Sequence, residues 1–231
     1  MTIQTVVTSA SIRVIGSVPA TVFASQAQVM VEMRDLVQDV AIEIAQAAEW
    51  RALTRIGTIA GGATTAGLPV DYDRMLTGQG MQDTANWFWG YYPYRDVSEY
   101  MMAINGQVPT LDPGGWIILE NTIRFWPATS GTAQFPYISS FIVLDQDGAT
   151  RKATFDADND TYMLSERLLT LGLIWRYRAQ KGLEYAEDMQ TYSNELEQAS
   201  NNDKGARILR PDWPSRRIPG ARYAYTGRAF P

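Results

Sequence analysis

The stretch from Asp160 to Gln180 carries apolar side chains on more than one side of the helix that it predicts. One face holds residues at steps of three and four, and a second face adds three more: Leu164, Leu168, Leu171 and Trp175, then Leu169, Leu173 and Tyr177. A helix that is apolar on several sides is buried in the middle of a protein or shared between subunits. We therefore expect this segment to lie at the centre of a helical body.

Two further segments have the periodicity of long helices. The first runs from Ser25 to about Leu53, where Ser25 and Gln28 have the spacing of a capping box. The second runs from Leu183 to Ser200. Asp160 is placed to cap the central helix, and residues 95–104 predict a short additional helix.

Between the long helices, frequent glycine and proline residues separate short runs that favour strands. The runs are Thr54–Ile59, Trp116–Leu119, Thr122–Trp126, Tyr137–Val143 and Ala149–Phe155. Asn121 and the pair Asp147-Gly148 are typical of turns between paired strands. The pattern predicts a small antiparallel sheet that is inserted into the helical body.

The fold class that we expect is α+β, mainly α: a helical bundle with an inserted small antiparallel β-region and an extended C-terminal arm. The expected parts are an N-terminal segment with a bundle helix at 1–56, the β-rich insertion at 57–158, the C-terminal bundle helices at 159–203 and the arm at 204–231.

The chain contains no histidine and no cysteine. These absences exclude a thiol nucleophile and a disulfide, and they argue strongly against a zinc site and a serine triad. The run Asp156–Asp160 resembles a calcium loop, but Thr161 and Arg167 stand where an EF-hand needs glycine and glutamate. No phosphate-binding glycine motif occurs. We expect no enzyme activity, cofactor or metal, although distant carboxylate pairs for glycoside hydrolysis stay open.

Charge is distributed unevenly along the chain. Residues 201–231 have seven basic and two acidic side chains, a net charge of +5, which leaves −10 on the rest of a chain whose net charge is −5. Proline disfavours regular structure there, and the aromatic residues are too many for a plain solubilising tail. We expect an arm that orders on a partner, with contacts from Arg207, Arg210, Trp213, Arg216, Arg217, Arg222, Tyr223 and Tyr225.

Two further groups of side chains are candidates for binding. The densest aromatic cluster holds Trp87, Phe88, Trp89, Tyr91 and Tyr92. We favour an interface with a neighbouring subunit or another protein for it over stacking on sugars or bases. Acidic side chains recur along one face of the first long helix: Glu32, Asp35, Asp39 and Glu43. They indicate a solvated face, or the lining of a channel through which DNA moves without specific binding.

Six blocks of the sequence, in this order, are similar to the head-to-tail adaptors of tailed bacteriophages, especially short-tailed ones, also called connector, tail tubular or tail accessory proteins. The blocks are residues 36–45 (LVQDVAIEIA), 49–54 (EWRALT), 68–76 (LPVDYDRML), 155–161 (FDADNDT), 165–176 (SERLLTLGLIWR) and 181–186 (KGLEYA). The resemblance covers roughly Thr2 to Leu209, and it rests on the order and spacing of the blocks more than on any one of them.

The resemblance implies a structural virion protein and a homo-oligomeric ring, typically of twelve copies. Such a ring lies between the portal protein and the tail nozzle or tail-tube protein, and it extends the DNA channel. The family's C-terminal segments embrace the portal, which agrees with the arm inferred from charge. Without a signal peptide or an apolar run of membrane-spanning length, we expect assembly in the host cytoplasm and no membrane.

Two alternatives stay open. A tail nozzle or tail-tube component would share the structural role but occupy a different ring. A protein that binds or degrades polysaccharide would use the aromatic cluster and the surplus of acids.

Overall fold

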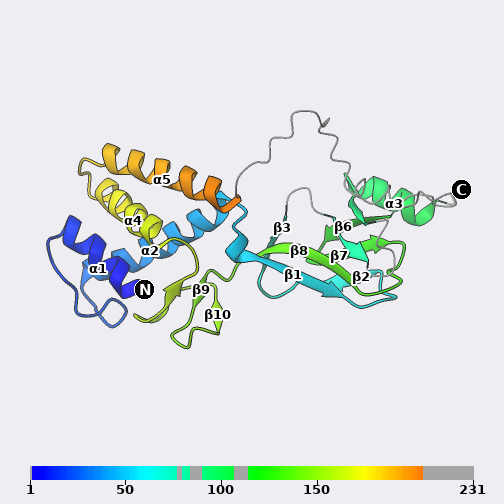
Figure 1. The fold of residues 1–231 in the computed structure, drawn as a ribbon, viewed down its shortest axis with the longest axis horizontal. Coiled ribbons are helices and arrows are strands. Elements are labelled where there is room, and N and C mark those ends of the chain that lie inside the picture. The colour runs from blue at the N-terminus through cyan, green and yellow to red at the C-terminus, as the bar shows by residue number, and fades with distance from the viewer. Residues whose placement is uncertain (1, 77–79, 84–89, 107–113, 205–231) are drawn as a thin grey trace, which may run out of the picture. The chain divides into compact units, whose positions relative to one another are not determined.

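The computed structural model describes residues 2–76, 80–83, 90–106 and 114–204, which form a mixed α+β protein (Figure 1). The described chain divides into two compact units. The first consists of residues 2–53 and 139–204, and the second of residues 54–138. The second unit is thus an insertion between two halves of the first.

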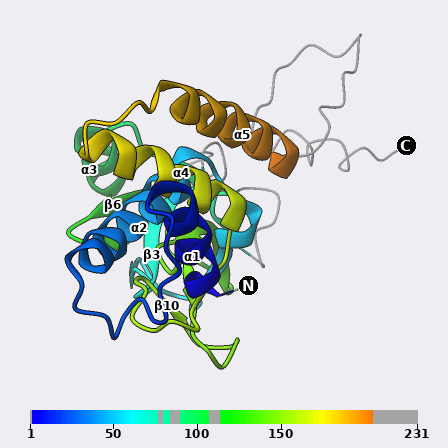
Figure 2. The ribbon, with the colours of Figure 1, turned by 90° about the vertical axis from the view of Figure 1, so that its left-hand side faces the viewer.

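Helices make up most of the first unit. They are α1 (Ile3–Val14), α2 (Gln28–Ala47), the 3-10 turn η1 (Arg51–Leu53), α4 (Glu166–Gln180) and α5 (Ala186–Lys204). Helix α4 contacts α1, α2 and α5, and Figure 2 shows it between α1 and α5. The helix with two apolar faces is therefore buried among three others.

Helices α2 and α4 pack closely because one residue at their contact has no side chain. A Cβ atom on Gly172 would lie 2.3 Å from Cγ1 of Val40. Around this point, completely buried side chains of both helices form the core: Met33, Val37 and Ile44 of α2, and Leu168, Leu169 and Leu173 of α4. The glycine allows these rows of side chains to interdigitate.

The helix starts differ from the sequence predictions. Helix α2 begins at Gln28 without a side-chain cap, so the capping box of Ser25 and Gln28 does not form. Helix α4 is capped by Ser165, whose Oγ accepts from the amide of Leu168 at 3.4 Å. The predicted cap, Asp160, is five residues earlier, and its carboxylate is engaged in the loop that precedes strand β11 (Thr161–Tyr162). Helix α1 was not predicted.

A small sheet with strand order β10-β9-β11 also belongs to the first unit. Its strands are β9 (Val143–Leu144), β10 (Arg151–Lys152) and β11. The sequence pattern places residues 139–158 in the β-rich insertion, whereas in the structure they belong to the first unit and form hydrogen bonds with α2. The amide of Phe155 donates to Oε1 of Gln38, and the hydroxyl of Tyr162 donates to the carbonyl of Ala41. Hydrogen bonds with a helix distant in sequence decide this placement.

The second unit contains two four-stranded sheets. In the first, the strand order is β1-β8-β3 with β4 also on β8: β1 (Thr54–Ile59), β8 (Ala133–Ser139), β3 (Tyr72–Met75) and β4 (Gln82–Asp83). In the other, it is β2-β7-β6-β5: β2 (Thr65–Gly67), β7 (Thr122–Trp126), β6 (Gly115–Leu119) and β5 (Tyr92–Pro93). Because β5 pairs with β6 in parallel, this sheet is mixed and not wholly antiparallel as predicted.

Aromatic side chains dominate the core of the second unit. Buried members of this core are Ile59, Met81, Tyr91, Trp116, Ile123, Phe125, Ala133, Phe135 and Tyr137. Helix α3 (Val97–Asn105) is capped by Asp96 and contacts β6 and β7. Its Tyr100 is buried, whereas Met101 and Met102 are exposed. The short helix expected at 95–104 is therefore present, two residues later at its start.

Candidate functional site

Many residues of the predicted sites lie outside the described ranges. These are the arm residues Arg207, Arg210, Trp213, Arg216, Arg217, Arg222, Tyr223 and Tyr225, together with Trp87, Phe88 and Trp89 of the aromatic cluster. Tyr91 and Tyr92 of that cluster are described, and so are all four acids of the predicted channel face.

Tyr91 is a core residue of the second unit. Its side chain is 2% exposed, its ring packs edge-on against Phe125, and its backbone pairs in both directions with Met81. Burial raises the pKa of the Tyr91 phenol to about 12, and the nearby Asp83 acts in the same direction. Tyr91 thus packs in the core of the second unit, and an interface role for it stays a prediction. Tyr92 lies in β5 and is half-buried.

The acidic face of α2 separates into two kinds of residue. Glu32 pairs with Lys181, the residue that follows α4, at 2.6 Å, and Glu43 pairs with Arg176 of α4 and accepts from the hydroxyl of Tyr192. The hydrogen bond from Lys181 lowers the pKa of Glu32. These two acids join helices within the chain.

Asp35 and Asp39 are exposed, and within the described ranges neither makes an ion pair or a side-chain hydrogen bond. They are therefore the acids of this face that stay available to a partner. Their recurrence at steps of three and four residues makes all four acids look alike in the sequence. The difference depends on where Arg176 and Lys181 lie opposite α2.

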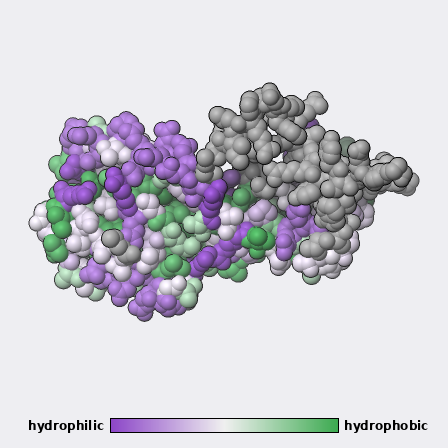
Figure 3. All heavy atoms as spheres, in the orientation of Figure 1, coloured by the Kyte–Doolittle hydropathy of each residue, from purple (hydrophilic) through white to green (hydrophobic). Residues whose placement is uncertain are grey.

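Basic side chains of α4 also reach α5. Arg167 pairs with Glu195 at 3.1 Å, and Arg178 pairs with Asp188. Helix α5 presents a hydrophilic outer face, which Figure 3 shows at the upper left. Its inner face is fixed to α4 through these pairs and through Tyr192, which is buried against Trp175.

The loop Asp156–Asp160 accepts hydrogen bonds from two distant segments of the first unit. Its carbonyls at Asp158 and Asp160 accept from the first amides of α1, those of Gln4 and Ile3, at 3.2 and 2.7 Å. The Asp158 carboxylate accepts from the amides of Val22 and Phe23. These bonds satisfy amides that a helix start or a bend would otherwise leave unpaired. The run that resembles a calcium loop is thus a structural junction.

Lys152 occupies the centre of an acidic cluster beside this loop. Its Nζ lies 2.8 Å from Oδ1 of the completely buried Asp160 and 3.1 Å from Oδ1 of Asp145, and it also contacts Asp156. Burial would lower the pKa of Lys152, but the hydrogen bonds that its ammonium donates to Asp156, Asp160 and Asp145 outweigh this effect and raise the pKa. These three carboxylates have the spacing of metal ligands. The lysine ammonium takes the position that a cation would need.

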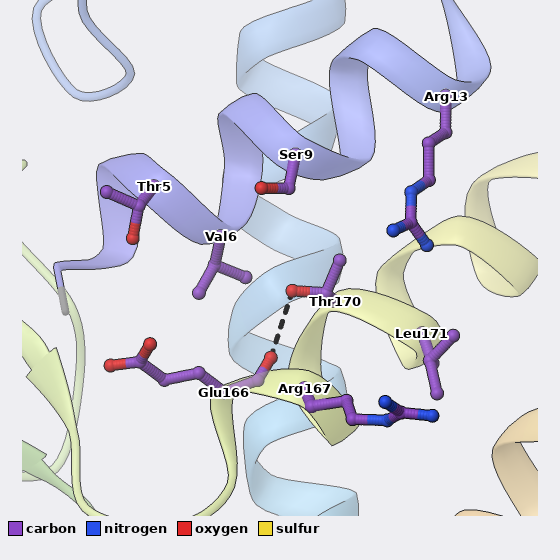
Figure 4. Close-up of a pocket in the computed structure, with 8 residues that line it drawn as sticks. All are labelled: Thr5, Val6, Ser9, Arg13, Glu166, Arg167, Thr170 and Leu171. Atoms are coloured by element: carbon purple, nitrogen blue, oxygen red, sulfur yellow. Dashed lines mark hydrogen bonds between the residues drawn. The ribbon is translucent and has the colours of Figure 1, made fainter.

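Figure 4 shows a groove between α1 and α4 with a volume of about 360 Å³. It is lined by Thr5, Val6, Ser9 and Arg13 of α1, and by Glu166, Arg167, Thr170 and Leu171 of α4. Arg13 and Arg167 lie toward one end of the view and Glu166 toward the other. Arg13 is exposed and has no ion pair within the described part of the chain. The groove combines hydroxyl groups, two guanidinium groups, one carboxylate and apolar patches, and its net positive charge suits a protein surface that carries acids.

Sequence reasoning missed this groove and the role of Lys152. The spacing of Lys152 and Asp156, four residues apart, was the available signal for one of the ion pairs. Arg13 gave no signal because α1 itself was not predicted. Among the described helices, none has the length and apolar character needed to cross a membrane.

The chain matches no curated protein. The family model described as SU10 adaptor protein matches residues 1–219, which include both units and much of the predicted arm. Such a match leaves only the last twelve residues outside, so the chain belongs to the SU10 adaptor protein family of bacteriophage head-to-tail adaptors.

Proposed function

We propose that this structural adaptor of a phage virion forms a ring, with twelve copies as the expected number, between the portal protein and the tail. The observation that carries the proposal is the family match over residues 1–219. In this ring, the helices of the first unit form the bundle that we expected, and the ring extends the DNA channel. Interfaces that differ on the two sides of a subunit generate such closed rings.

A purely structural role is consistent with the chemistry of the described residues. The chain has no histidine and no cysteine. The buried carboxylate Asp160 and most acids between the helices are bound to lysine or arginine in ion pairs that hold elements together. We propose that DNA passes through the ring without specific binding, and that assembly takes place in the host cytoplasm without a membrane.

The arm at 204–231 is the part that we propose to bind the portal. Its high density of arginine with aromatic residues suits a long, acidic protein surface. A chain that ends after Lys204 keeps α5 complete, including the bond from the amide of Arg51 to Asp203. We expect this truncated chain to fold normally and to lose attachment to purified portal rings in a co-sedimentation assay.

A length-matched control separates charge from chain length. A full chain with Arg207, Arg210, Arg216, Arg217 and Arg222 changed to glutamine keeps every aromatic residue of the arm. We expect it to bind portal rings much more weakly than the native chain and with little dependence on salt. Undiminished binding of the truncated chain to the portal would show that the arm is not the portal contact.

Electron microscopy of particles tests the position of the ring. In our proposal, density for this chain lies directly below the portal. Density for the same chain further from the head would favour the alternative of a tail nozzle or tail-tube component.

A further inference from the structure

One face of α2 is exposed along most of the helix. It carries Val31, Asp35, Asp39, Ile42 and Gln46, which follow one another at steps of three and four residues. At 100° per residue these positions fall within an arc of roughly 80°. Val31 and Ile42 are each 40% exposed. We call this face the α2 stripe: two acids in the middle with an apolar residue toward each end.

A complementary surface lies on α1 and α4. The groove of Figure 4 presents Arg13 and Arg167 with the hydroxyls of Ser9 and Thr170. Ile12, which neighbours Arg13 on the exposed side of α1, is 51% exposed, and Leu171 lines the groove. The groove carries two arginines and one acid, Glu166, so it offers net positive charge beside apolar contact area. The α2 stripe offers negative charge beside apolar contact area.

We infer that the α2 stripe of one copy docks in the α1–α4 groove of a second copy. Asp35 and Asp39 would face Arg13 and Arg167, and Val31 or Ile42 would cover Ile12. The two surfaces carry opposite charges, and charge complementarity therefore selects a second copy as the occupant. Within the described chain, no residue forms an ion pair with Asp35, Asp39 or Arg13, so these charges are available to that copy. The inference rests on the proposed ring and names its subunit contact.

The docking has the symmetry that a ring needs. The stripe belongs to α2 and the groove to α1 and α4, so each copy has one of each and uses both with different neighbours. Such head-to-tail contacts propagate until the rotation closes. Under this inference, Asp35 and Asp39 face the neighbouring copy and not the channel.

Charge exchange tests the contact in the full chain. The double variant Asp35→Lys/Asp39→Lys has a reversed stripe and a native groove, and the variant Arg13→Glu has a native stripe and a reversed groove. Each alone should weaken self-association by about tenfold or more, since like charges then meet. A 1:1 mixture should recover assembly, because every stripe then finds a groove of opposite charge.

A matched control keeps the total charge change but moves it to another helix. Glu187 and Glu197 are exposed acids of α5, so Glu187→Lys/Glu197→Lys adds the same charge to the same unit. Self-association of this control should equal that of the native chain. Sedimentation velocity over a concentration series measures the native chain, the two variants, their mixture and the control, and thermal unfolding checks that each chain is folded.

Cross-linking locates the contact directly. A photoreactive benzoylphenylalanine at Ser9 lies in the groove, and trypsin releases the stripe from Asp35 onward as one peptide of residues 35–51. Mixing this chain with an isotopically labelled native chain identifies cross-links between copies. We expect labelled peptide 35–51 to be the main product, in the free assembly or in rings on the portal.

Two outcomes would overturn the inference, and they differ from failure of the proposed function. If rings form but cross-link from Ser9 to other peptides, or if rings form with both charge reversals, the ring stands and this subunit contact is wrong. If the chain stays monomeric at high concentration and on portal-bearing particles, the proposed ring itself is wrong.

Discussion

Charged side chains connect the helices of the first unit, whereas aromatic rings fill the space between the strands of the second. Three arginines of α4, and Lys181 just after it, pair with acids of α2 and α5, and Lys152 neutralises a cluster around the buried Asp160. In the second unit, the rings of Tyr91 and Phe125 pack edge to face with centroids 5.8 Å apart, and those of Phe135 and Tyr137 are equally close.

This contrast indicates which changes each unit tolerates. Removing one partner of a buried ion pair leaves an uncompensated charge, which costs more than the pair contributed. Adding volume to a close-packed core forces side chains out of their preferred rotamers. We therefore expect the first unit to be most sensitive to charge and the second to be most sensitive to volume.

Replacement of Lys152 by methionine should have the largest effect. It leaves the buried Asp160 without its cation, at a cost of about 3 kcal/mol in the free energy of unfolding of the first unit. Hydrogen exchange followed by mass spectrometry should show faster exchange at α1 and in residues 156–160, and unchanged exchange in β6 and β7. Lys152→Arg keeps the positive charge, so its free energy of unfolding should fall much less. Equal destabilisation by both variants would mean that packing, and not charge, is important there.

A pair of glycine substitutions tests sensitivity to volume in both units. A Cβ on Gly57 would lie 2.4 Å from the ring of Phe135, and a Cβ on Gly172 would lie 2.3 Å from Val40. Gly57→Ala and Gly172→Ala should each cost about 1–3 kcal/mol. Hydrogen exchange should place the loss in the second unit for Gly57→Ala and in the first for Gly172→Ala. As a control, Gly67→Ala adds a methyl group where no atom lies within 4 Å, so stability should change little.

The sequence was most informative where a local signal decides the structure. The hairpin at Asn121 is an example: β6 and β7 pair from Leu119 to Thr122, and Glu120 and Asn121 have φ angles of 52° and 58°. These left-handed conformations suit asparagine and build the tight turn that the pattern predicted. The strand Thr54–Ile59 also has the predicted bounds.

Elements that depend on distant residues could not be predicted in this way. Helix α1 is rich in valine, isoleucine and threonine, which favour strands, and loop carbonyls from Asp158 and Asp160 cap its start. Nothing near Thr2 in the sequence gives that signal. The same limit applies to the candidate site: the periodicity found the acidic face of α2, but only the fold shows that Glu32 and Glu43 are engaged while Asp35 and Asp39 are exposed.

Alkaline pH should affect the second unit through Tyr137. Burial raises its pKa to about 12, and its hydrogen bond of 2.8 Å to Asp71 acts in the same direction. Because the folded-state pKa lies above the ordinary value of about 10, this stabilisation is complete below pH 10 and is lost as the pH rises toward 12. Tyr137→Phe should cost about 1 kcal/mol near neutral pH and should flatten the pH dependence above pH 10. Urea unfolding over a pH series measures this dependence. If the free energy of unfolding of Tyr137→Phe falls above pH 10 as steeply as that of the native chain, other groups cause the alkaline loss of stability.

The smallest effects on stability should come from the acids of α2. Comparing Glu43 with Asp35 tests the distinction between acids that pair within the chain and acids that are available to a neighbouring copy. Glu43 is 35% exposed and Arg176 is 41% exposed, so water screens their pair, and Glu43→Gln should cost at most about 1 kcal/mol in urea unfolding. Asp35→Asn should leave stability unchanged, because Asp35 has no ion pair within the described chain. In a self-association assay the order should reverse: Asp35→Asn weakens association between copies, and Glu43→Gln does not. Opposite rankings in the two assays would show that one helical face contains both structural and interface acids, whereas equal rankings would mean that the face acts as a unit.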